Sequence, residues 1–317
     1  MKVLVTGCAG FIGYHVVRRL LADGDAVVGL DHLGPYYDPA LKRARVADLR
    51  RAGPLEFHVG DLADFERLRA LAADVDVVLH LAAQPGVRHA LLDPFSYERS
   101  NLLGMLHVLE VVRRRIPPPR LVWASSSSVY GGNARTPFAE ADRVDDPLSL
   151  YAATKRAGEL LAHSYRHLFG LETLGLRFFT VYGPWGRPDM AYWRFTEALF
   201  DDRPLEIYGD AAASRDMTYI DDVVDGVVAA VRRSVPDELL NLGNAEPIPL
   251  DRLVQTIERA VGRVARRIAA PPQPGDVATT FADLARAEAA LGYRPRVRLE
   301  EGIARFVDWY RWWRSVR

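Results

Sequence analysis

Short apolar runs alternate along this chain with longer stretches in which apolar residues recur at helical spacing. Val and Leu dominate the runs, which lie at 3–7, 26–31, 55–61, 75–83, 120–126 and 172–179. The helical pattern covers residues 11–23, 62–72, 94–114 and 149–169. Apolar runs separated by helical segments are typical of parallel strands joined by crossover helices. The pattern therefore predicts an α/β fold with a doubly wound, Rossmann-like parallel sheet.

The pattern loosens after about residue 180, where segments rich in Pro and Gly separate shorter elements. We expect a Rossmann domain over residues 1–180 and a smaller C-terminal substrate-binding lobe formed mainly by 181–317. Residues 216–245 are expected to return to the first domain, with an element at 238–242 joining its sheet. The last amphipathic stretch, 299–313, is predicted to pack as a helix.

Composition narrows the class of protein. Hydrophobic residues make up 49% of the 317 positions and the formal net charge is zero, which permits a sizeable core and disfavours a nucleic-acid partner. No apolar run reaches the roughly 20 residues that cross a bilayer. The single cysteine, Cys8, excludes a disulfide framework and a cysteine-rich zinc site, and we assign no metal ligands. With no signal-peptide pattern at the N-terminus, we expect a soluble cytoplasmic protein.

Three glycines follow the first predicted strand and open a helix: Gly7, Gly10 and Gly13, at G-x-x-G-x-x-G spacing. Glycines let the backbone approach a pyrophosphate, and the helix N-terminus offers it free N–H groups. The alternative is a tight turn that binds nothing. Asp31 ends the next strand, where a carboxylate accepts ribose hydroxyls and repels a 2′-phosphate; its alternative role is a helix N-cap. The segment therefore predicts NAD rather than NADP.

Further contacts with NAD are expected along the same edge of the sheet. Asp61 is placed to reach the adenine, and the small side chains of Ala82 and Ala83 allow the cofactor to approach closely. The remaining predicted contacts are Phe11, Ile12, Leu62, Leu81, Tyr151 and Lys155.

Tyr151 and Lys155 lie four residues apart and share one face of the predicted helix 149–169. A tyrosine with a pKa of about 10 is a poor base, but a nearby ammonium and the positive nicotinamide favour the phenolate. An exposed helical pair is the alternative. Lysine is rare here, because Lys2, Lys42 and Lys155 are the only three among 41 basic residues. The pair is therefore predicted to transfer a proton.

Several motifs occur together and in the order seen in the extended short-chain dehydrogenase/reductases of the NAD-dependent epimerase/dehydratase family. Among these, the chain most resembles the UDP-glucuronate 4-epimerases. The motifs are "TGCAGFIG", "YYDPALKRAR", "SSSSVYG", "YAATK", "GPWGRPDM" and "SRDMTYIDDVVDG". The resemblance implies retained NAD, a UDP-sugar substrate and a homodimer built on helices 94–114 and 149–169.

The resemblance also implies residue roles. It assigns the catalytic hydroxyl to Ser126, the base to Tyr151 and its supporting cation to Lys155. Arg215 matches a diphosphate-binding arginine. Asn101 matches a structural asparagine near the active site, and capping within a helix is its alternative role. Residues 190–209 and 273–276 are expected to complete the UDP site.

Four consecutive serines, 125–128, end the fifth predicted strand. Related 4,6-dehydratases carry Asp-Glu at the positions of Ser127 and Ser128, and decarboxylases typically carry Glu at Ser128. With hydroxyls here, the chain lacks the obvious acid or base for chemistry at C5 and C6. The sequence therefore predicts a UDP-glucuronate 4-epimerase.

The sugar carboxylate needs a polar environment, because a 4-keto-hexuronate is a β-keto acid that loses CO₂ easily. We expect Ser127, Ser128 and Thr180 to hold it by charge-assisted hydrogen bonds. Arg187 is predicted to contact the carboxylate or the diphosphate, and Arg88 is added to the substrate site. For the serines, a satisfied network at the strand end is the alternative.

Three other functions stay open from the sequence. The nearest are decarboxylation to a UDP-pentose and 4-epimerisation of neutral UDP-hexoses. A non-enzymatic NAD-binding regulator is a different class, and the complete set of Ser126, Tyr151 and Lys155 argues against it.

Overall fold

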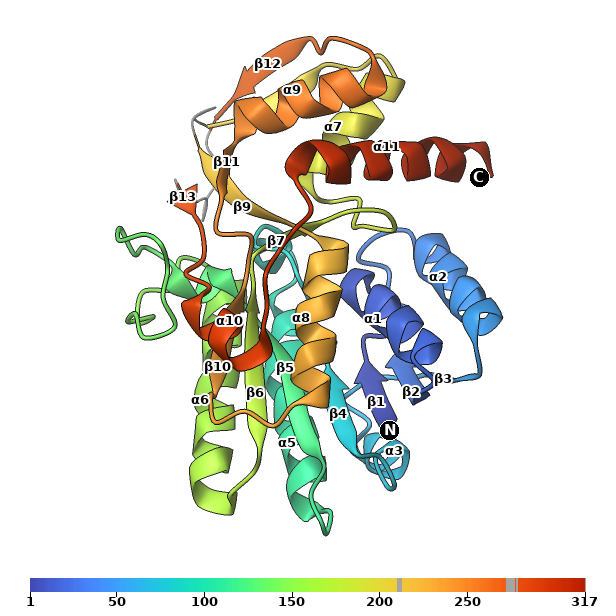
Figure 1. Ribbon diagram of the computed structural model, residues 1–317, viewed down its shortest axis with the longest axis vertical. Coiled ribbons are helices and arrows are strands. Elements are labelled where there is room, and N and C mark those ends of the chain that lie inside the picture. Colours follow the sequence, from blue (N-terminus) through green and yellow to red (C-terminus); the bar gives the residue numbers. More distant parts are fainter. Residues whose placement is uncertain (210–212, 272–276, 278, 317) are drawn as a thin grey trace.

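The computed structural model describes residues 1–209, 213–271, 277 and 279–316. Within them, seven parallel strands form one sheet in the order β10-β6-β5-β4-β1-β2-β3 (Figure 1). The strands are β1 (Lys2–Thr6), β2 (Ala26–Asp31), β3 (Leu55–Val59), β4 (Val77–His80), β5 (Arg120–Ser126), β6 (Thr173–Phe178) and β10 (Leu239–Leu242). This sheet confirms the predicted fold class, and β10 confirms the element expected at 238–242.

Helices cover both faces of the sheet, and a separate apolar core lies under each layer. One layer contains α1 (Phe11–Ala22), α2 (Pro39–Ala52) and α8 (Ile220–Arg232), with α1 packed against both others. The opposite layer contains α3 (Phe65–Leu71), α5 (Gly104–Arg114) and α6 (Leu150–Phe169). Because both faces are covered, central strands such as β4 and β6 are buried along their whole length, which explains their continuous apolar runs.

Local capping sets where these helices begin and end. Ser149 accepts a hydrogen bond from the amide of Ala152 at the start of α6, and Gly170 ends that helix in the left-handed conformation at φ +64°. The predicted helix 62–72 is wrong at its start, because the Asp64 side chain caps a helix that begins at Phe65.

The predicted helix 94–114 is three consecutive helical segments rather than one regular helix. It runs through α4 (Pro94–Tyr97), a π-helical turn η2 (Glu98–Leu103) and α5. The π-helical turn carries the buried Asn101, whose amide oxygen accepts a hydrogen bond from the Gln84 amide at 2.8 Å and whose amide nitrogen donates to Thr154 on α6 at 3.0 Å. Asn101 therefore joins the chain after β4 to α6.

The second lobe lies beyond the carboxyl ends of the main strands (Figure 1). Its larger sheet contains β7 (Thr180–Tyr182), β9 (Ser214–Tyr219), β11 (Pro247–Pro249) and β13 (Thr279–Thr280), and β8 (Leu205–Tyr208) pairs with β12 (Arg267–Ala270). Three helices pack here: α7 (Ala191–Phe200), α9 (Leu250–Val261) and α11 (Leu299–Ser315). A fourth, α10 (Ala285–Leu291), packs beside β10. No helix in the described part of the chain is both long and apolar enough to span a bilayer.

Candidate active site

A cavity of about 1000 Å³ opens between the carboxyl ends of the main strands and the second lobe. This is the crevice in which doubly wound folds bind ligands. Its walls bring together every residue that the sequence predicted individually for the cofactor, the substrate and catalysis, together with part of the segment 190–209. The individual roles of these residues remain predictions.

The glycine loop forms one wall of the cavity. Gly7 has φ +74°, and a Cβ there would lie 2.7 Å from the amide nitrogen of Ala82. A Cβ on Gly13 would lie 2.2 Å from the carbonyl oxygen of Gly7. The backbone is therefore packed more tightly than any side chain allows, next to the first turn of α1. This arrangement fits a dinucleotide pyrophosphate at a helix N-terminus.

Asp31 lies beside the glycine loop and is almost fully buried. Its carboxylate accepts hydrogen bonds from the amides of Ala9 (3.1 Å) and Leu33 (2.8 Å) and from the ammonium of Lys42 (3.3 Å). Burial opposes its ionisation, but the hydrogen bond from His32 and the charge of Lys42 prevail and lower the pKa of Asp31 to about 2. A carboxylate that is ionised at neutral pH therefore lines the cavity beside the glycine loop, which fits the predicted contact with ribose. Lys42 was not predicted from the sequence.

Asp61 lies farther along the same edge of the sheet. Its carboxylate accepts from the Ala63 amide at 2.8 Å and from Arg99 at 3.0 Å. Partial burial opposes ionisation, but these hydrogen bonds lower the pKa of Asp61 overall. A fixed carboxylate at this end of the cavity fits the adenine contact that was predicted.

Tyr151, Lys155 and Ser126 meet near the centre of the cavity. The Lys155 ammonium donates to the carbonyl of Ala124 at 2.9 Å and lies 6.0 Å from the centre of the Tyr151 ring. Desolvation raises the pKa of Tyr151, whereas a hydrogen bond with Ser126 and the charge of Arg187 lower it. Burial lowers the pKa of Lys155 to about 8. The cation that lowers the pKa of Tyr151 in this arrangement is thus Arg187, and the supporting role of Lys155 stays a prediction.

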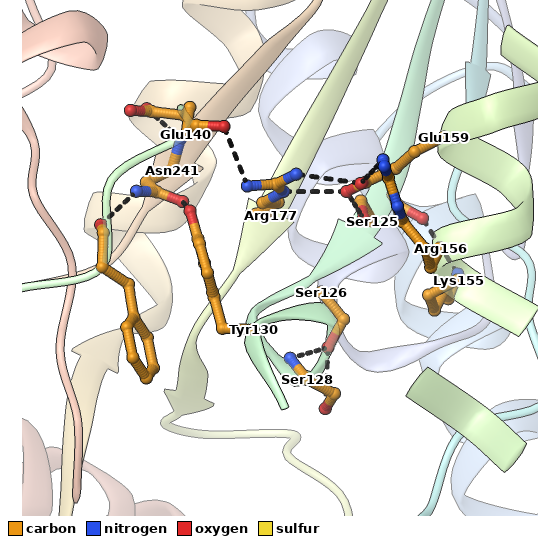
Figure 2. A network of polar contacts seen from close by, with 12 residues as sticks. Ser125, Ser126, Ser128, Tyr130, Glu140, Lys155, Arg156, Glu159, Arg177 and Asn241 are labelled. Atoms are coloured by element: carbon orange, nitrogen blue, oxygen red, sulfur yellow. Dashed lines mark hydrogen bonds and ion pairs between the residues drawn. The ribbon is translucent and has the colours of Figure 1, made fainter. Parts of the chain in front are cut away.

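The four serines do not share one environment. Ser125 donates to the carboxylate of Glu159 on α6 at 2.6 Å, within a buried polar network (Figure 2). Ser126 and Ser128 are hydrogen-bonded to each other at the start of the 3₁₀ turn η3 (Ser127–Tyr130). All four serines line the cavity together with Thr180 of β7, and the hydroxyl of Ser125 is already engaged by Glu159. The strand end therefore supplies hydroxyls both to the cavity and to the protein interior.

Arg187 is held by a partner that the sequence did not reveal. Its guanidinium donates to both carboxylate oxygens of Asp189, at 3.1 and 2.7 Å, and Tyr36 donates to Asp189 at 3.1 Å. Burial opposes ionisation of Asp189, but the charge of Arg187 lowers its pKa overall. Asp189 is therefore an ion-paired carboxylate and a poor proton donor.

Arg45, on α2, fixes the loop that precedes Arg187. Its fully buried guanidinium donates to the carbonyl oxygens of Trp185 (2.5 Å) and Gly186 (2.8 Å) and to that of Ala9 in the glycine loop (2.9 Å). One side chain thus joins the glycine loop to the loop that precedes Arg187.

Aromatic and cationic side chains form the far end of the cavity. The guanidinium of Arg88 lies 4.9 Å from the centre of the Tyr208 ring, and that of Arg194 lies 5.7 Å from it. Arg215, on β9, also lines the cavity. Met190, Arg194 and Tyr208 fall in the predicted UDP segment 190–209, whereas 273–276 lie outside the described residues.

The chain matches the NAD dependent epimerase/dehydratase family over residues 3–243, and it belongs to that family. A probable UDP-glucuronate 4-epimerase of Rhizobium meliloti (strain 1021) is 46% identical, covering 98% of this chain and 97% of the relative. UDP-glucuronate 4-epimerase 4 of Arabidopsis thaliana is 47% identical, covering 98% and 75%.

A solved structure extends the likeness to the whole fold. It is the UDP-glucuronic acid 4-epimerase of Bacillus cereus in complex with UDP-glucuronic acid and NAD. It superimposes with a TM-score of 0.92 at 35% identity, over 99% of this chain and 100% of that one. The family and this likeness agree with the predicted cofactor, NAD.

Proposed function

We propose that this chain interconverts UDP-glucuronate and UDP-galacturonate by inverting C4 of the sugar with NAD. The observation that carries the proposal is the chemistry around Tyr151: the side chains of Ser126, Ser127, Ser128 and Thr180 line the cavity with hydroxyls. The acidic residue beside Arg187, Asp189, is ion-paired. The other acids that line the cavity in the described part of the chain, Asp31, Asp61 and Glu206, are also each paired with a cation. Such a site supports proton transfer at O4 and disfavours dehydration. The similarity to UDP-glucuronate 4-epimerases over nearly the whole chain supports the same substrate.

The reaction needs a base that works only while the sugar and cofactor are in place. Bound NAD supplies a reversible hydride acceptor, so that a ketone forms at C4 and is then reduced on its opposite face. Tyr151 removes the O4 proton and later returns it, with Ser126 as its hydrogen-bond partner. Arg187 and Lys155 favour the phenolate by their charge, because both are cations close to Tyr151.

Ser127, Ser128 and Thr180 bind the sugar carboxylate in this proposal. Neutral hydroxyl donors stabilise its charge without supplying a proton to C5. Arg88 and Arg215 hold the UDP moiety with residues of 190–209, so that the sugar can turn while its nucleotide stays anchored. Residues 1–180 form the cofactor part and 181–317 mainly the substrate part in this proposal. Of the segment 216–245 expected to return to the cofactor part, 220–242 carry α8 and β10, whereas 216–219 end β9 of the second sheet.

A homodimer is the proposed assembly. Leu102, Leu106, Ala157 and Leu160 line an apolar groove between the η2–α5 segment and α6. Leu160 is 51% exposed and Leu106 36%, which fits a second copy packing on these two helices. The cytoplasmic location stays a prediction.

The test is to incubate the purified protein with UDP-glucuronate and to separate the products. UDP-galacturonate supports the proposal, whereas UDP-xylose identifies a decarboxylase. Turnover of UDP-glucose alone identifies an epimerase of neutral hexoses. The variant Tyr151→Phe should lose activity by about a thousandfold or more. Tyr165→Phe is the matched control, since Tyr165 lies on the same helix with its hydroxyl on Glu110. NAD released on denaturation measures cofactor retention.

A further inference from the structure

Behind Lys155 lies a buried ion pair between Glu159 on α6 and Arg177 on β6, and both side chains are 1% exposed. Arg177 donates to both carboxylate oxygens of Glu159, at 2.8 and 2.9 Å (Figure 2). Arg156 adds a third contact at 3.2 Å. Burying a charged pair is costly unless its hydrogen bonds are satisfied, so this pair needs a reason beyond stability alone.

The pair contacts the strand end that carries the catalytic serine. Lys155 and Glu159 lie one turn apart on α6, and they bind consecutive residues of β5: Lys155 donates to the Ala124 carbonyl, and Glu159 accepts from Ser125. Ser125 is also the direct neighbour of Arg177 in the β5–β6 register. The next residue along β5 is Ser126. The ion pair therefore fixes the backbone from which Ser126 reaches Tyr151.

Arg177 extends the same network to the serine turn. Its guanidinium lies 4.8 Å from the centre of the Tyr130 ring, the last residue of η3. Tyr130 donates to Asn241 on β10 at 2.7 Å, and the Asn241 backbone amide donates to Glu140 at 2.8 Å (Figure 2). One arginine thus supports both ends of the segment that carries Ser126, Ser127 and Ser128.

Charge gives the pair a second effect on Lys155. The titratable groups around Lys155 are Tyr151 and Glu159 on its own helix and His80 on β4, with Arg156 and Arg177 beyond Glu159. Burial, with a smaller contribution from Lys155, lowers the pKa of His80 to about 3, so His80 is neutral. Burial lowers the pKa of Lys155, and Glu159 raises it. Among these groups, the carboxylate of Glu159 is the anion that supports the ammonium.

We propose that Glu159, held by Arg177 and Ser125, is a positioning residue for the catalytic pair: it fixes the end of β5 and keeps Lys155 in its ammonium form. This proposal rests on the proposed function only where it uses kcat, because a measurement of kcat requires the proposed substrate. The state of Lys155 is measured without any sugar, so a failure of the substrate assignment and a failure of this proposal are distinguishable.

The chain has only three lysines, which makes a direct measurement practical. Protein labelled with ¹³Cε and ¹⁵Nζ lysine is titrated by NMR with NAD bound, and Lys2→Arg and Lys155→Arg assign the signals. Glu159→Gln should lower the titration midpoint of Lys155 by about one pH unit, because it removes the supporting charge. Arg177→Gln should raise the midpoint, because it leaves the carboxylate less compensated. Opposite shifts are a signature that loosened packing does not produce.

Two further variants separate position from charge. Ser125→Ala removes one hydrogen bond and no charge, so kcat should fall about fivefold while KM and the Lys155 midpoint stay unchanged. Glu110→Gln is the matched control: Glu110, on α5, is also held by two arginines and a hydroxyl, those of Arg113, Arg114 and Tyr165. It should leave the Lys155 midpoint unchanged.

The proposal is overturned if Glu159→Gln leaves the midpoint unchanged, if both charge variants shift it in the same direction, or if Glu110→Gln shifts it equally. If Glu159→Gln does not fold, Arg177→Gln and Ser125→Ala decide. The proposal is then rejected if Arg177→Gln does not raise the titration midpoint of Lys155, or if Ser125→Ala leaves kcat unchanged.

Discussion

Replacing Gly13 by alanine tests whether the glycine loop binds the cofactor through its backbone. Gly13 lies in the first turn of α1, where alanine is otherwise the better helix former. The added Cβ would lie 2.2 Å from the Gly7 carbonyl oxygen and 3.0 Å from the Cys8 Cα. Both atoms belong to the loop itself, so no flexible side chain can move aside.

The size of the effect follows from this geometry. An ordinary contact between a carbon atom and an oxygen atom needs about 3.4 Å, so the loop must open by roughly 1 Å. Overpacking of this kind costs about 1–3 kcal/mol. If the loop relaxes in the free protein, binding must close it again, and a cost of about 2 kcal/mol weakens NAD binding roughly 30-fold. The loss should appear in cofactor affinity more than in folding.

Calorimetry of NAD binding, together with thermal unfolding, measures both effects. Gly170→Ala is the matched control: Gly170 has φ +64° and open space around it, so alanine costs about 1 kcal/mol of stability with no contact near the cavity. We expect Gly170→Ala to lose stability and to keep its affinity for NAD. We expect Gly13→Ala to lose affinity for NAD and to lose less stability. Wild-type NAD affinity in a folded Gly13→Ala protein would refute the reasoning.

Three further predictions concern pH, the sugar carboxylate and assembly. Because desolvation raises the pKa of Tyr151 and burial lowers that of Lys155 to about 8, turnover should rise with pH up to about 8 and then level off, since further ionisation of Tyr151 is offset by loss of the Lys155 ammonium; a flat profile between about pH 6 and 8 contradicts this. Ser127→Ala/Thr180→Val should slow epimerisation about tenfold and release UDP-pentose, detected by chromatography. An unchanged rate without UDP-pentose counts against the hydroxyl site. Leu160→Glu should yield monomers by light scattering, whereas Val264→Glu, at an exposed position of the other lobe, should not. If light scattering gives the same mass in solution for both variants, the groove is not the dimer interface.

The sheet was predictable because its central strands are buried on both faces, so that a continuous apolar run marks strands such as β4 and β6. The edge strand β3 is partly exposed and mixes apolar with polar residues. Helix α2 was not predicted, and its buried face explains why. Lys42 and Arg45 are buried there beside Leu41, Val46 and Leu49, and two cations within an apolar stripe hide the helical period. The start of α3 and the π-helical turn depend on a cap and on a buried side chain. Hydropathy alone does not encode either of them.

The candidate site was predictable wherever a motif is local in sequence. The glycine loop, Asp31 and the Tyr151–Lys155 pair each depend on short spacings. Partners that lie far apart along the chain were missed: Lys42 with Asp31, Tyr36 with Asp189, and Glu159 with Arg177. Each pair forms only when separate elements come together, so one sequence does not reveal it. The rarity of lysine pointed to Lys155, and the same reasoning applied to Lys42 would have found it too.

The hydrogen bonds of Arg45 have a consequence for the order in which ligands assemble. This guanidinium holds the Ala9 carbonyl on one side and the loop before Arg187 on the other. A dinucleotide that immobilises the glycine loop at Ala9 also immobilises the loop before Arg187, because the planar guanidinium of Arg45 binds both loops. We therefore expect the coenzyme to act as a structural scaffold for nucleotide-sugar recognition, and the protein stripped of its dinucleotide to bind nucleotide sugars weakly even where no chemistry takes place.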